Sequence, residues 1–435
     1  MINYLEGILI LNELLSNQKK KREEIINIQN KKLRNIISYI YKNNKYYHDL
    51  FLDNNIKPED IKNINDINKI PKINKQQIRE NEFNIISSNY DVNKLHKMKT
   101  SGSTGNPLIV YINSNEDLIR KAKHIRSNKN LGQKIRDNWV TITGPHHFPQ
   151  KTTTIQDLLN IYNPRPVSVF LDIESQISSI AKLKPVILEG YATSLYLLAS
   201  YLEKKNYDII KPRFIISSAE LLTDSDREKI ESVFNVPVYD QYSCIEFGRV
   251  SWECEHRTGY HIDSDNLVVQ FIDESGEEVG VGETGEIVCT SLFNYSMPLI
   301  RYSIGDYGSL SDEPCNCGIT LPLMKHIEGR HDSIIVFPDG RKVSPRALSI
   351  SMSMFKDYSN IQQFQIIQKK VDSIKVSLKL KQTINNNFCS DLTAHLYNVL
   401  SLDKEQINID VELVENIPLS KTGKLFYIKS EVDSE

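Results

Sequence analysis

A regular alternation of β-rich and helical stretches between residues 139 and 239 constrains the fold of this chain more than any other feature. Short runs of strand-forming residues recur there, at Trp139–Thr143, Val167–Leu171, Val186–Leu188, Arg213–Ser217 and Val236–Tyr239. Helical spacing fills intervals between them, as at Thr193–Lys204, and Thr223 is placed to cap a further helix with Asp226 three residues on. Strands separated by helices lie parallel in one covered sheet. The sequence therefore predicts an α/β fold with a mostly parallel sheet.

After Asp332 the pattern changes to that of a smaller α+β unit. Two strands, a helix and a further strand are expected there, at Phe364–Gln368, Ser373–Leu380, Asn387–Leu400 and Ile407–Leu413. About 100 residues is an ordinary size for a domain. We therefore expect a large N-terminal domain over residues 1–331, with a helical lead-in around Leu33–Tyr41, and a mobile C-terminal domain over residues 332–435.

The composition argues against several classes of protein. The chain has 435 residues, 40% of them apolar, which is enough for sizeable cores. Its net charge of -2 argues against a protein that coats nucleic acid. No apolar run approaches the roughly 18 residues of a membrane span, and residues 1–15 are expected to form an amphipathic helix rather than a signal peptide. We expect a cytoplasmic protein whose six cysteines stay reduced, and the sequence leaves its oligomeric state open.

A loop of small residues at positions 100–107 is suited to bind a polyphosphate. Accessible backbone N–H groups and hydroxyl donors come from Ser101, Gly102, Ser103, Thr104 and Gly105. The loop is not a Walker loop, because no Gly-Lys-Ser/Thr sequence closes it. A flexible linker is the alternative, but the β-like run Leu108–Ile112 favours a phosphate loop within a hairpin.

This loop resembles the phosphate-binding motif of the adenylate-forming superfamily, and four further motifs follow in the order that is usual for that family. Within the superfamily the chain is most similar to phenylacetate-CoA ligases and related capsule-biosynthesis proteins. The resemblance implies an AMP-forming ligase that uses ATP and Mg²⁺ to activate a small carboxylate as an acyl-adenylate, with coenzyme A as the acceptor. One departure is Asn106, where many relatives carry a lysine, so contact with the outgoing pyrophosphate is expected to be weaker.

The second motif is Tyr239–Gly248. Its resemblance implies that Tyr242 lies against adenine and that Glu246 binds the magnesium ion bridging the ATP phosphates, a ligand type that is normal for magnesium. Thr104 is implied to act with Glu246 as a catalytic residue at the phosphates. Further ATP-binding positions implied by the resemblance are Ser218, Ala219, Glu220 and Ser243.

The remaining motifs imply contacts with ribose and a mobile catalytic cation. Asp306 matches the aspartate that accepts hydrogen bonds from the ribose hydroxyls, and Arg330 matches an arginine that reaches ribose and phosphate. Asp332 falls at the hinge between the domains. In Pro418–Lys424 the resemblance implies a catalytic lysine that stabilises charge at the α-phosphate. Lys421 is a competing candidate, but the spacing from Ser420 and Gly423 favours Lys424.

Cysteines and histidines on two separate segments suggest a metal site. Cys254 and the pair Cys315 and Cys317 supply three thiolates, and an imidazole from His256 or His261 would complete a tetrahedral, structural zinc site. A similar pairing in phenylacetate-CoA ligases favours His261 as the fourth ligand. Ordinary reduced cysteines are the alternative.

Residues that follow two of the predicted strands are candidates for the acyl pocket. His146, His147 and Phe148 stand where relatives place pocket residues, and an exposed loop is the equal alternative. Tyr191 and Cys244 are assigned to the same pocket. A flat, partly polar pocket of this kind would suit an aromatic acid.

The sequence leaves two other functions open. The acyl group could pass to an amine or to the thiol of a carrier protein instead of coenzyme A. A non-catalytic nucleotide-binding scaffold is a further alternative, which the presence of Glu246, Asp306 and Lys424 disfavours.

Overall fold

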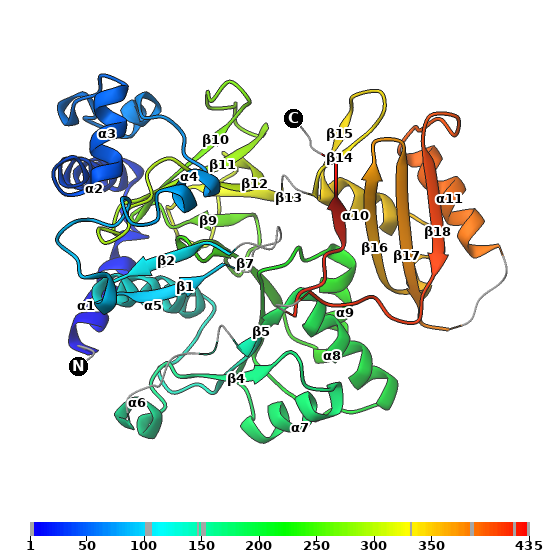
Figure 1. Cartoon of the computed structure of the whole chain (residues 1–435). Coiled ribbons are helices and arrows are strands. Elements are labelled where there is room, and N and C mark those ends of the chain that lie inside the picture. Colours follow the sequence, from blue (N-terminus) through cyan, green and yellow to red (C-terminus); the bar gives the residue numbers. More distant parts are fainter. Residues whose placement is uncertain are drawn as a thin grey trace.

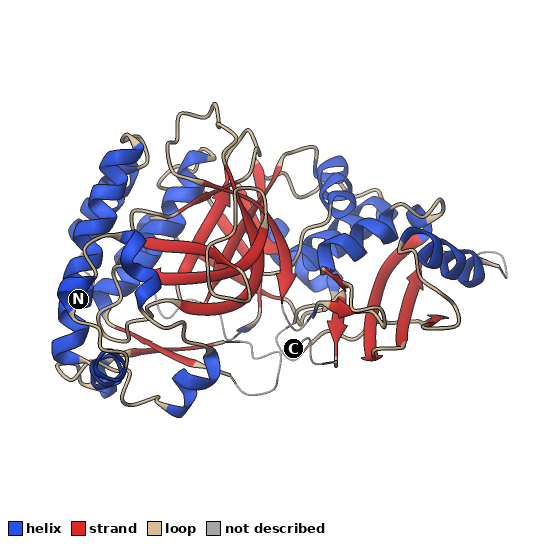
Figure 2. Ribbon diagram, turned by 90° about the horizontal axis from the view of Figure 1, so that it is seen from above, coloured by secondary structure: helices blue, strands red, loops and turns tan. Residues whose placement is uncertain are grey.

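The computed structural model of the chain describes residues 4–100, 107–145, 148, 154–330, 333–382, 387–420 and 423–432. It contains a large sheet with helices packed around it and, at the C-terminal end of the chain, a smaller sheet with its own helices (Figure 1). Seen from above, the two sheets form separate layers beside each other (Figure 2). Within the described part of the chain, no helix combines the length and the apolarity needed to cross a membrane.

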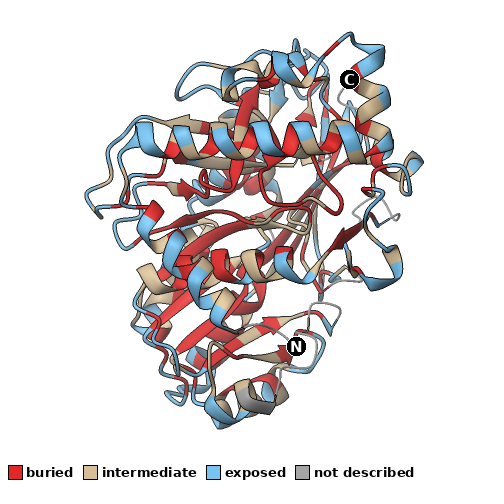
Figure 3. Cartoon of the chain, turned by 90° about the vertical axis from the view of Figure 1, so that its left-hand side faces the viewer, coloured by how far each residue is buried: buried red, intermediate tan, exposed pale blue. Residues whose placement is uncertain are grey.

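Helices form the N-terminal lead-in, as predicted. They are α1 (Tyr4–Asn17), α2 (Arg22–Asn43), α3 (Lys45–Asp53) and α4 (Lys75–Glu80). Leu33, Ile36 and Ile40 of α2 recur at helical spacing and are buried, whereas the opposite face of the helix is polar. Figure 3 shows the same division on the helices of this side of the molecule, with buried residues on the inner face and exposed residues outside.

The parallel half of the large sheet matches the predicted alternation. Its strands, in spatial order, are β4 (Pro164–Ser168), β3 (Trp139–Thr143), β5 (Ile187–Tyr191), β6 (Phe214–Ser218) and β7 (Val238–Cys244). The helices of this region are α5 (Ser114–Asn130), α6 (Thr154–Leu159), α7 (Ile173–Leu183), α8 (Ala192–Lys205) and α9 (Asp224–Phe234). Thr223 caps α9 by accepting a hydrogen bond from the Asp226 N–H at 3.1 Å, as predicted.

The bounds of the second predicted strand, Val167–Leu171, differ from those in the structure. The second strand ends at Ser168, and the chain turns before α7 instead of continuing extended to Leu171. Asp172 explains the turn, because its side chain caps α7 by accepting a hydrogen bond from the Ser175 N–H at 2.9 Å.

The other half of the large sheet is antiparallel, so the expectation of a mostly parallel sheet holds for only part of it. These strands are β8 (Gly248–Glu253), β9 (Tyr260–Ile262), β13 (Leu323–Arg330), β12 (Tyr302–Ser311), β11 (Thr284–Ser291) and β10 (Leu267–Ile272). The connection from β7 to β8 spans only residues 245–247. A connection that short permits only antiparallel pairing, because a parallel crossover needs a dozen residues or more.

The candidate phosphate loop lies at the end of a hairpin, as expected. β1 (His96–Lys99) pairs antiparallel with β2 (Ile109–Ile112), and Lys99 faces Ile109. Beyond this pair, the Thr100 N–H donates to the Leu108 carbonyl at 2.9 Å. The two ends of the loop are therefore held together.

The C-terminal part forms a compact α+β unit with its own core. Its elements are β14 (Ile335–Val336), β15 (Lys342–Val343), α10 (Pro345–Ser353), β16 (Ile361–Lys370), β17 (Ser373–Leu380), α11 (Phe388–Val399), β18 (Asn408–Leu413) and β19 (Ile428–Ser430). The four-stranded sheet has the order β18-β17-β16-β19. Its core extends from Ile335 to Ile428, which agrees with the predicted small second domain, and the predicted hinge residue Asp332 lies outside the described residues.

Candidate active site and metal centre

The C-terminal end of β7 and strand β12 bring the second and third motifs together. The Tyr242 hydroxyl donates to Asp306 Oδ2 at 2.6 Å, although the two residues are 64 positions apart. Glu246 follows β7, and its Oε1 accepts a hydrogen bond from the Tyr302 hydroxyl at 3.2 Å. Tyr302 and Asp306 both belong to β12. The residues implied for adenine, magnesium and ribose therefore share one region.

Two further motifs reach this region. Arg330 lies opposite Asp306 in the β12–β13 register, with its Nε 3.5 Å from Asp306 Oδ1. Lys424 approaches from the C-terminal domain, where its Nζ donates to the Ala219 carbonyl at 3.2 Å and lies 5.4 Å from the centre of the Tyr191 ring. Three of the five motifs are thus joined by direct contacts, and Lys424 of the fifth motif contacts Ala219 and Tyr191 at the ends of the neighbouring parallel strands.

Glu220 bonds to the backbone of both domains. Its Oε2 accepts from the Thr193 N–H and its Oε1 from the Leu425 N–H, both at 2.9 Å. Burial raises the pKa of Glu220 and lowers the pKa of Lys424, and the attraction between the two charges opposes both shifts. The carboxylate that was implied to line the nucleotide pocket therefore also lies at the contact between the domains.

The remaining described positions of these motifs lie at strand ends beside the site. Ser218 ends β6 and Ser243 lies near the end of β7, and both are half-buried. Ala219 has a φ of 68°, which is uncommon for a residue with a side chain, and its carbonyl is the acceptor for Lys424. Strained backbone of this kind is frequent at functional sites.

The described acyl-pocket candidates have different surroundings. Tyr191 ends β5, and its hydroxyl lies 3.1 Å from Thr143 Oγ1 and accepts from the Gly144 N–H at 3.3 Å. Phe148 is half-buried. Burial raises the pKa of Cys244 well above its usual value, so its thiol stays protonated and unreactive. Other predicted site residues lie outside the described residues: Ser101, Gly102, Ser103, Thr104, Gly105, His146, His147 and Asp332.

Helix α5 holds the loop that carries Glu246, a role that the sequence analysis missed. Arg120 donates to the carbonyls of Ile245 and Glu246, at 2.6 and 3.2 Å, and Lys123 donates to the Phe247 carbonyl at 3.2 Å. Both cations are buried, and burial lowers the pKa of each. Their three-residue spacing puts them on one face of a helix. Because basic residues with this spacing are also common on exposed helix faces, the spacing did not indicate that these two side chains are buried.

The predicted metal ligands lie together in the structure. Cys254 Sγ is 3.4 Å from Cys315 Sγ, and Cys317 Sγ is 3.3 Å from His261 Nε2. All four ligand atoms lie within 4.8 Å of one another. Atoms bound to one tetrahedral zinc ion are roughly 3.5 to 4 Å apart, so the set is close to the required geometry.

Hydrogen bonding selects His261 as the imidazole of this cluster. Its Nδ1 lies 3.3 Å from the Leu321 carbonyl, an arrangement that directs Nε2 toward the thiols. Burial lowers the pKa of His261 to about 4, so the ring is neutral. His256, the alternative, has an exposed side chain whose Nε2 is 3.9 Å from Glu255.

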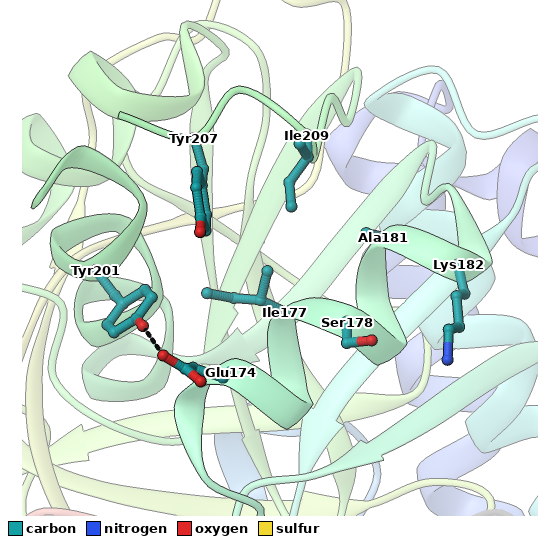
Figure 4. Close-up of a pocket in the computed structure, with 8 residues that line it drawn as sticks. All are labelled: Glu174, Ile177, Ser178, Ala181, Lys182, Tyr201, Tyr207 and Ile209. Carbon is teal, nitrogen blue, oxygen red and sulfur yellow. Dashed lines mark hydrogen bonds between the residues drawn. The ribbon is translucent and has the colours of Figure 1, made fainter. Parts of the chain in front are cut away.

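A separate pocket of about 550 Å³ is formed by residues of α7, by Tyr201 of α8 and by the segment that follows α8 (Figure 4). Tyr201, Tyr207 and Ile177 line it, and the Tyr201 hydroxyl donates to Glu174 at its edge. None of the described nucleotide-site or metal-cluster residues lines this pocket.

Comparison with known proteins gives matches over most of the chain. Residues 335–431 match a family model described as the CapK C-terminal domain. Protein CapK from Staphylococcus aureus is 28% identical over 418 residues, which covers 93% of this chain and 90% of that protein. Phenylacetate-coenzyme A ligase from Thermus thermophilus is 25% identical over 328 residues, or 72% of each chain.

Solved structures of one ligase match the fold. The 2-hydroxyisobutyryl-CoA ligase in its postadenylation state, in complex with R3-HIB-AMP, gives a TM-score of 0.80 at 16% identity over 95% of this chain and 90% of that chain. The same ligase in its thioesterification state, with 2-HIB-AMP and CoA, gives a TM-score of 0.64 over 95% of this chain and 92% of that chain. The overall arrangement of this chain is therefore more similar to the first of these two states.

Proposed function

Because this chain belongs to the phenylacetate-CoA ligase and CapK branch of the adenylate-forming superfamily, we propose that it is an AMP-forming acyl-CoA ligase. It activates a small carboxylate with ATP and passes the acyl group to a thiol. The observation that carries the proposal is the meeting of Tyr242, Asp306, Arg330 and Lys424 in one region, since these residues come from four separate motifs.

In the first step, an oxygen of the carboxylate attacks the α-phosphorus of ATP, and the bond to the pyrophosphate oxygen breaks. The products are acyl-AMP and pyrophosphate. The hydroxyls and N–H groups of residues 101–105 would hold the phosphates, and Asp306 would accept hydrogen bonds from the ribose. Magnesium bound at Glu246 would neutralise phosphate charge. Lys424 would stabilise the charge that develops between the carboxylate and the α-phosphate.

In the second step, a thiolate sulfur attacks the acyl carbon and AMP leaves with its phosphate oxygen. Coenzyme A is the proposed acceptor. The similarity to CapK over 93% of the chain keeps an amine or a carrier-protein thiol as the second candidate, because the closer match is not to a protein named as a CoA ligase. Incubating enzyme, ATP and acid with each acceptor separates these possibilities.

The proposed acid is aromatic. Its pocket would be lined by Tyr191, Phe148 and the neighbouring His146 and His147, whose rings would pack against a flat substrate. A panel of aromatic and aliphatic carboxylic acids, assayed by ATP–pyrophosphate exchange, tests the choice. Exchange restricted to aliphatic acids would contradict it.

Lys424→Ala tests the mechanism directly. We expect carboxylate-dependent ATP–pyrophosphate exchange to fall roughly 100-fold or more, since a preorganised charge at the reacting phosphate is lost. Thioester formation from supplied acyl-AMP should be retained. Lys421→Ala, at the competing lysine, is the matched control and should keep most of its exchange activity. Normal exchange in Lys424→Ala would overturn the assignment.

We further propose that Cys254, His261, Cys315 and Cys317 bind one structural zinc ion. Four protein ligands leave no position open for substrate, so the ion would take no part in the reaction. It would join the segment after β8 to the segment before β13, and so stabilise the antiparallel half of the sheet.

A further inference from the structure

Residues just after the Pro418–Lys424 motif contact the N-terminal domain at a small polar cluster. We propose that Glu220, Thr193 and Asp226 of the N-terminal domain, with Leu425 and Tyr427 of the C-terminal domain, form a clasp that positions Lys424 for adenylation and must open before acyl transfer. The inference rests on the proposed function, because it assigns positioning residues to that same reaction.

Glu220 fixes the backbone directly beside the catalytic lysine. One carboxylate oxygen accepts from the N–H of Leu425, the residue after Lys424, and the other from the N–H of Thr193 at the start of α8. The carboxylate therefore joins the two domains through two bonds of 2.9 Å. Because the restraint acts one residue from Lys424, it limits where the lysine Nζ can lie.

Tyr427 supplies the second half of the clasp. Its ring packs on Phe364 in the core of the C-terminal domain, with the ring centres 5.2 Å apart. Its hydroxyl reaches into the N-terminal domain, where it accepts from Thr193 Oγ1 at 3.3 Å and donates to Asp226 Oδ2 at 3.5 Å. A ring held by one domain and a hydroxyl bonded in the other resist sliding of the domains.

The clasp is built so that it can open. Glu220 and Asp226 are held by neutral donors, namely backbone N–H and hydroxyl groups. Burial raises the pKa of both carboxylates, because their charged forms lose hydration. Separation of the domains would return water to these carboxylates, and that gain offsets part of the lost bonding.

The arrangement that contains the clasp is the one in which Lys424 reaches the site residues. Lys424 Nζ contacts the Ala219 carbonyl and the Tyr191 ring in the same arrangement in which Leu425 and Tyr427 contact the loop after β6 and helix α8. The overall arrangement is also more similar to the postadenylation state of a related fold than to its thioesterification state. The clasp should therefore favour adenylation and oppose acyl transfer.

The charged and titratable groups around Asp226 come from both domains. They are Glu220, Tyr196, Tyr358 and Tyr427. Substitution of Asp226 alters all of these interactions at once, so Tyr427 and Thr193 offer the cleaner tests.

Tyr427→Phe removes only the hydroxyl. We expect kcat for ATP–pyrophosphate exchange to fall roughly tenfold, the effect of losing hydrogen bonds worth about 1.4 kcal/mol. The KM for ATP should change less than twofold, and thioester formation from supplied acyl-AMP should be unchanged or faster. Tyr397→Phe is the control, because that hydroxyl donates to Ile407 within the C-terminal domain at 2.8 Å and should leave the ratio of the two half-reactions unchanged.

Thr193→Ala removes the partner hydroxyl from the other domain and guards against a folding defect of Tyr427→Phe. The same selective loss of exchange is expected. Equal loss of both half-reactions, or no loss of exchange in either folded variant, would overturn the clasp. Absence of exchange in the wild-type protein with every acid would instead refute the proposed function.

Discussion

Replacing Arg120 by methionine tests whether α5 positions the loop that carries Glu246. The guanidinium donates to two consecutive carbonyls, those of Ile245 and Glu246, at 2.6 and 3.2 Å. Hydrogen bonds from a charged donor contribute about 1.5–3 kcal/mol each. The variant also removes a buried charge, whose desolvation cost is reflected in the lowered pKa of Arg120. We therefore expect a net loss of about 2–4 kcal/mol in the free energy of unfolding.

The same change should weaken magnesium binding in the proposed reaction. With the Ile245 and Glu246 carbonyls unpaired, the Glu246 carboxylate is held less closely, and a loss of about 1.4 kcal/mol at the ion would raise the half-saturating magnesium concentration roughly tenfold. Exchange at saturating magnesium should recover much of the wild-type rate. The assays are denaturant unfolding and ATP–pyrophosphate exchange across a magnesium series.

Lys121→Met is the matched control on the same helix. Lys121 pairs with Asp117 at 2.7 Å, but its side chain is 56% exposed. An exposed pair contributes little, so unfolding should change by no more than about 0.5 kcal/mol and the magnesium dependence should stay as in the wild type. If Arg120→Met behaved like this control in both assays, the positioning role of α5 would be wrong.

Two further predictions concern the metal cluster and the clasp. Protein purified without chelator should contain close to one zinc per chain by elemental analysis, and Cys317→Ser should lose the metal and unfold at lower denaturant concentration; zinc-free wild-type protein would remove the site. Burial raises the pKa of Asp226 to about 6, so the folded state holds its proton more tightly than the unfolded state does. That carboxyl therefore lowers stability as pH rises from about 4 to 6, and Asp226→Asn should be more stable than the wild type above pH 6 by up to about 3 kcal/mol, with the difference vanishing near pH 4. A stability difference between the two proteins that stays constant from pH 4 to above pH 6 would contradict the raised pKa of Asp226.

Local sequence was sufficient where neighbours along the chain decide the structure. Ser373–Leu380 alternates apolar and polar residues and forms β17 with those bounds, and Thr223 caps α9 as its position suggested. The run Leu108–Ile112 predicted the hairpin formed by β1 and β2 on either side of the candidate phosphate loop. In each case the signal is a hydrophobic period or a capping residue that spans fewer than ten residues. The local structure could therefore be predicted without knowledge of distant contacts.

The fourth ligand of the metal cluster could not be predicted from local sequence alone. Spacing identified Cys254, Cys315 and Cys317 but left His256 and His261 both open until a resemblance favoured the second. Selection between them depends on the pairing of β9 with β13, which places His261 opposite Leu323 and close to the thiols. That pairing joins residues about 60 positions apart and is invisible in either segment alone.

By itself the sequence determined the identity and order of the motifs, the helical and extended segments, and the division into a large and a small unit. Only the tertiary structure decided that half of the large sheet is antiparallel, that Arg120 and Lys123 hold the Glu246 loop, and that Glu220 and Tyr427 join the domains. The physical reason is the same for all three. A basic or acidic side chain looks identical in sequence whether it is solvated or buried, and its role depends on which distant backbone groups the fold places beside it.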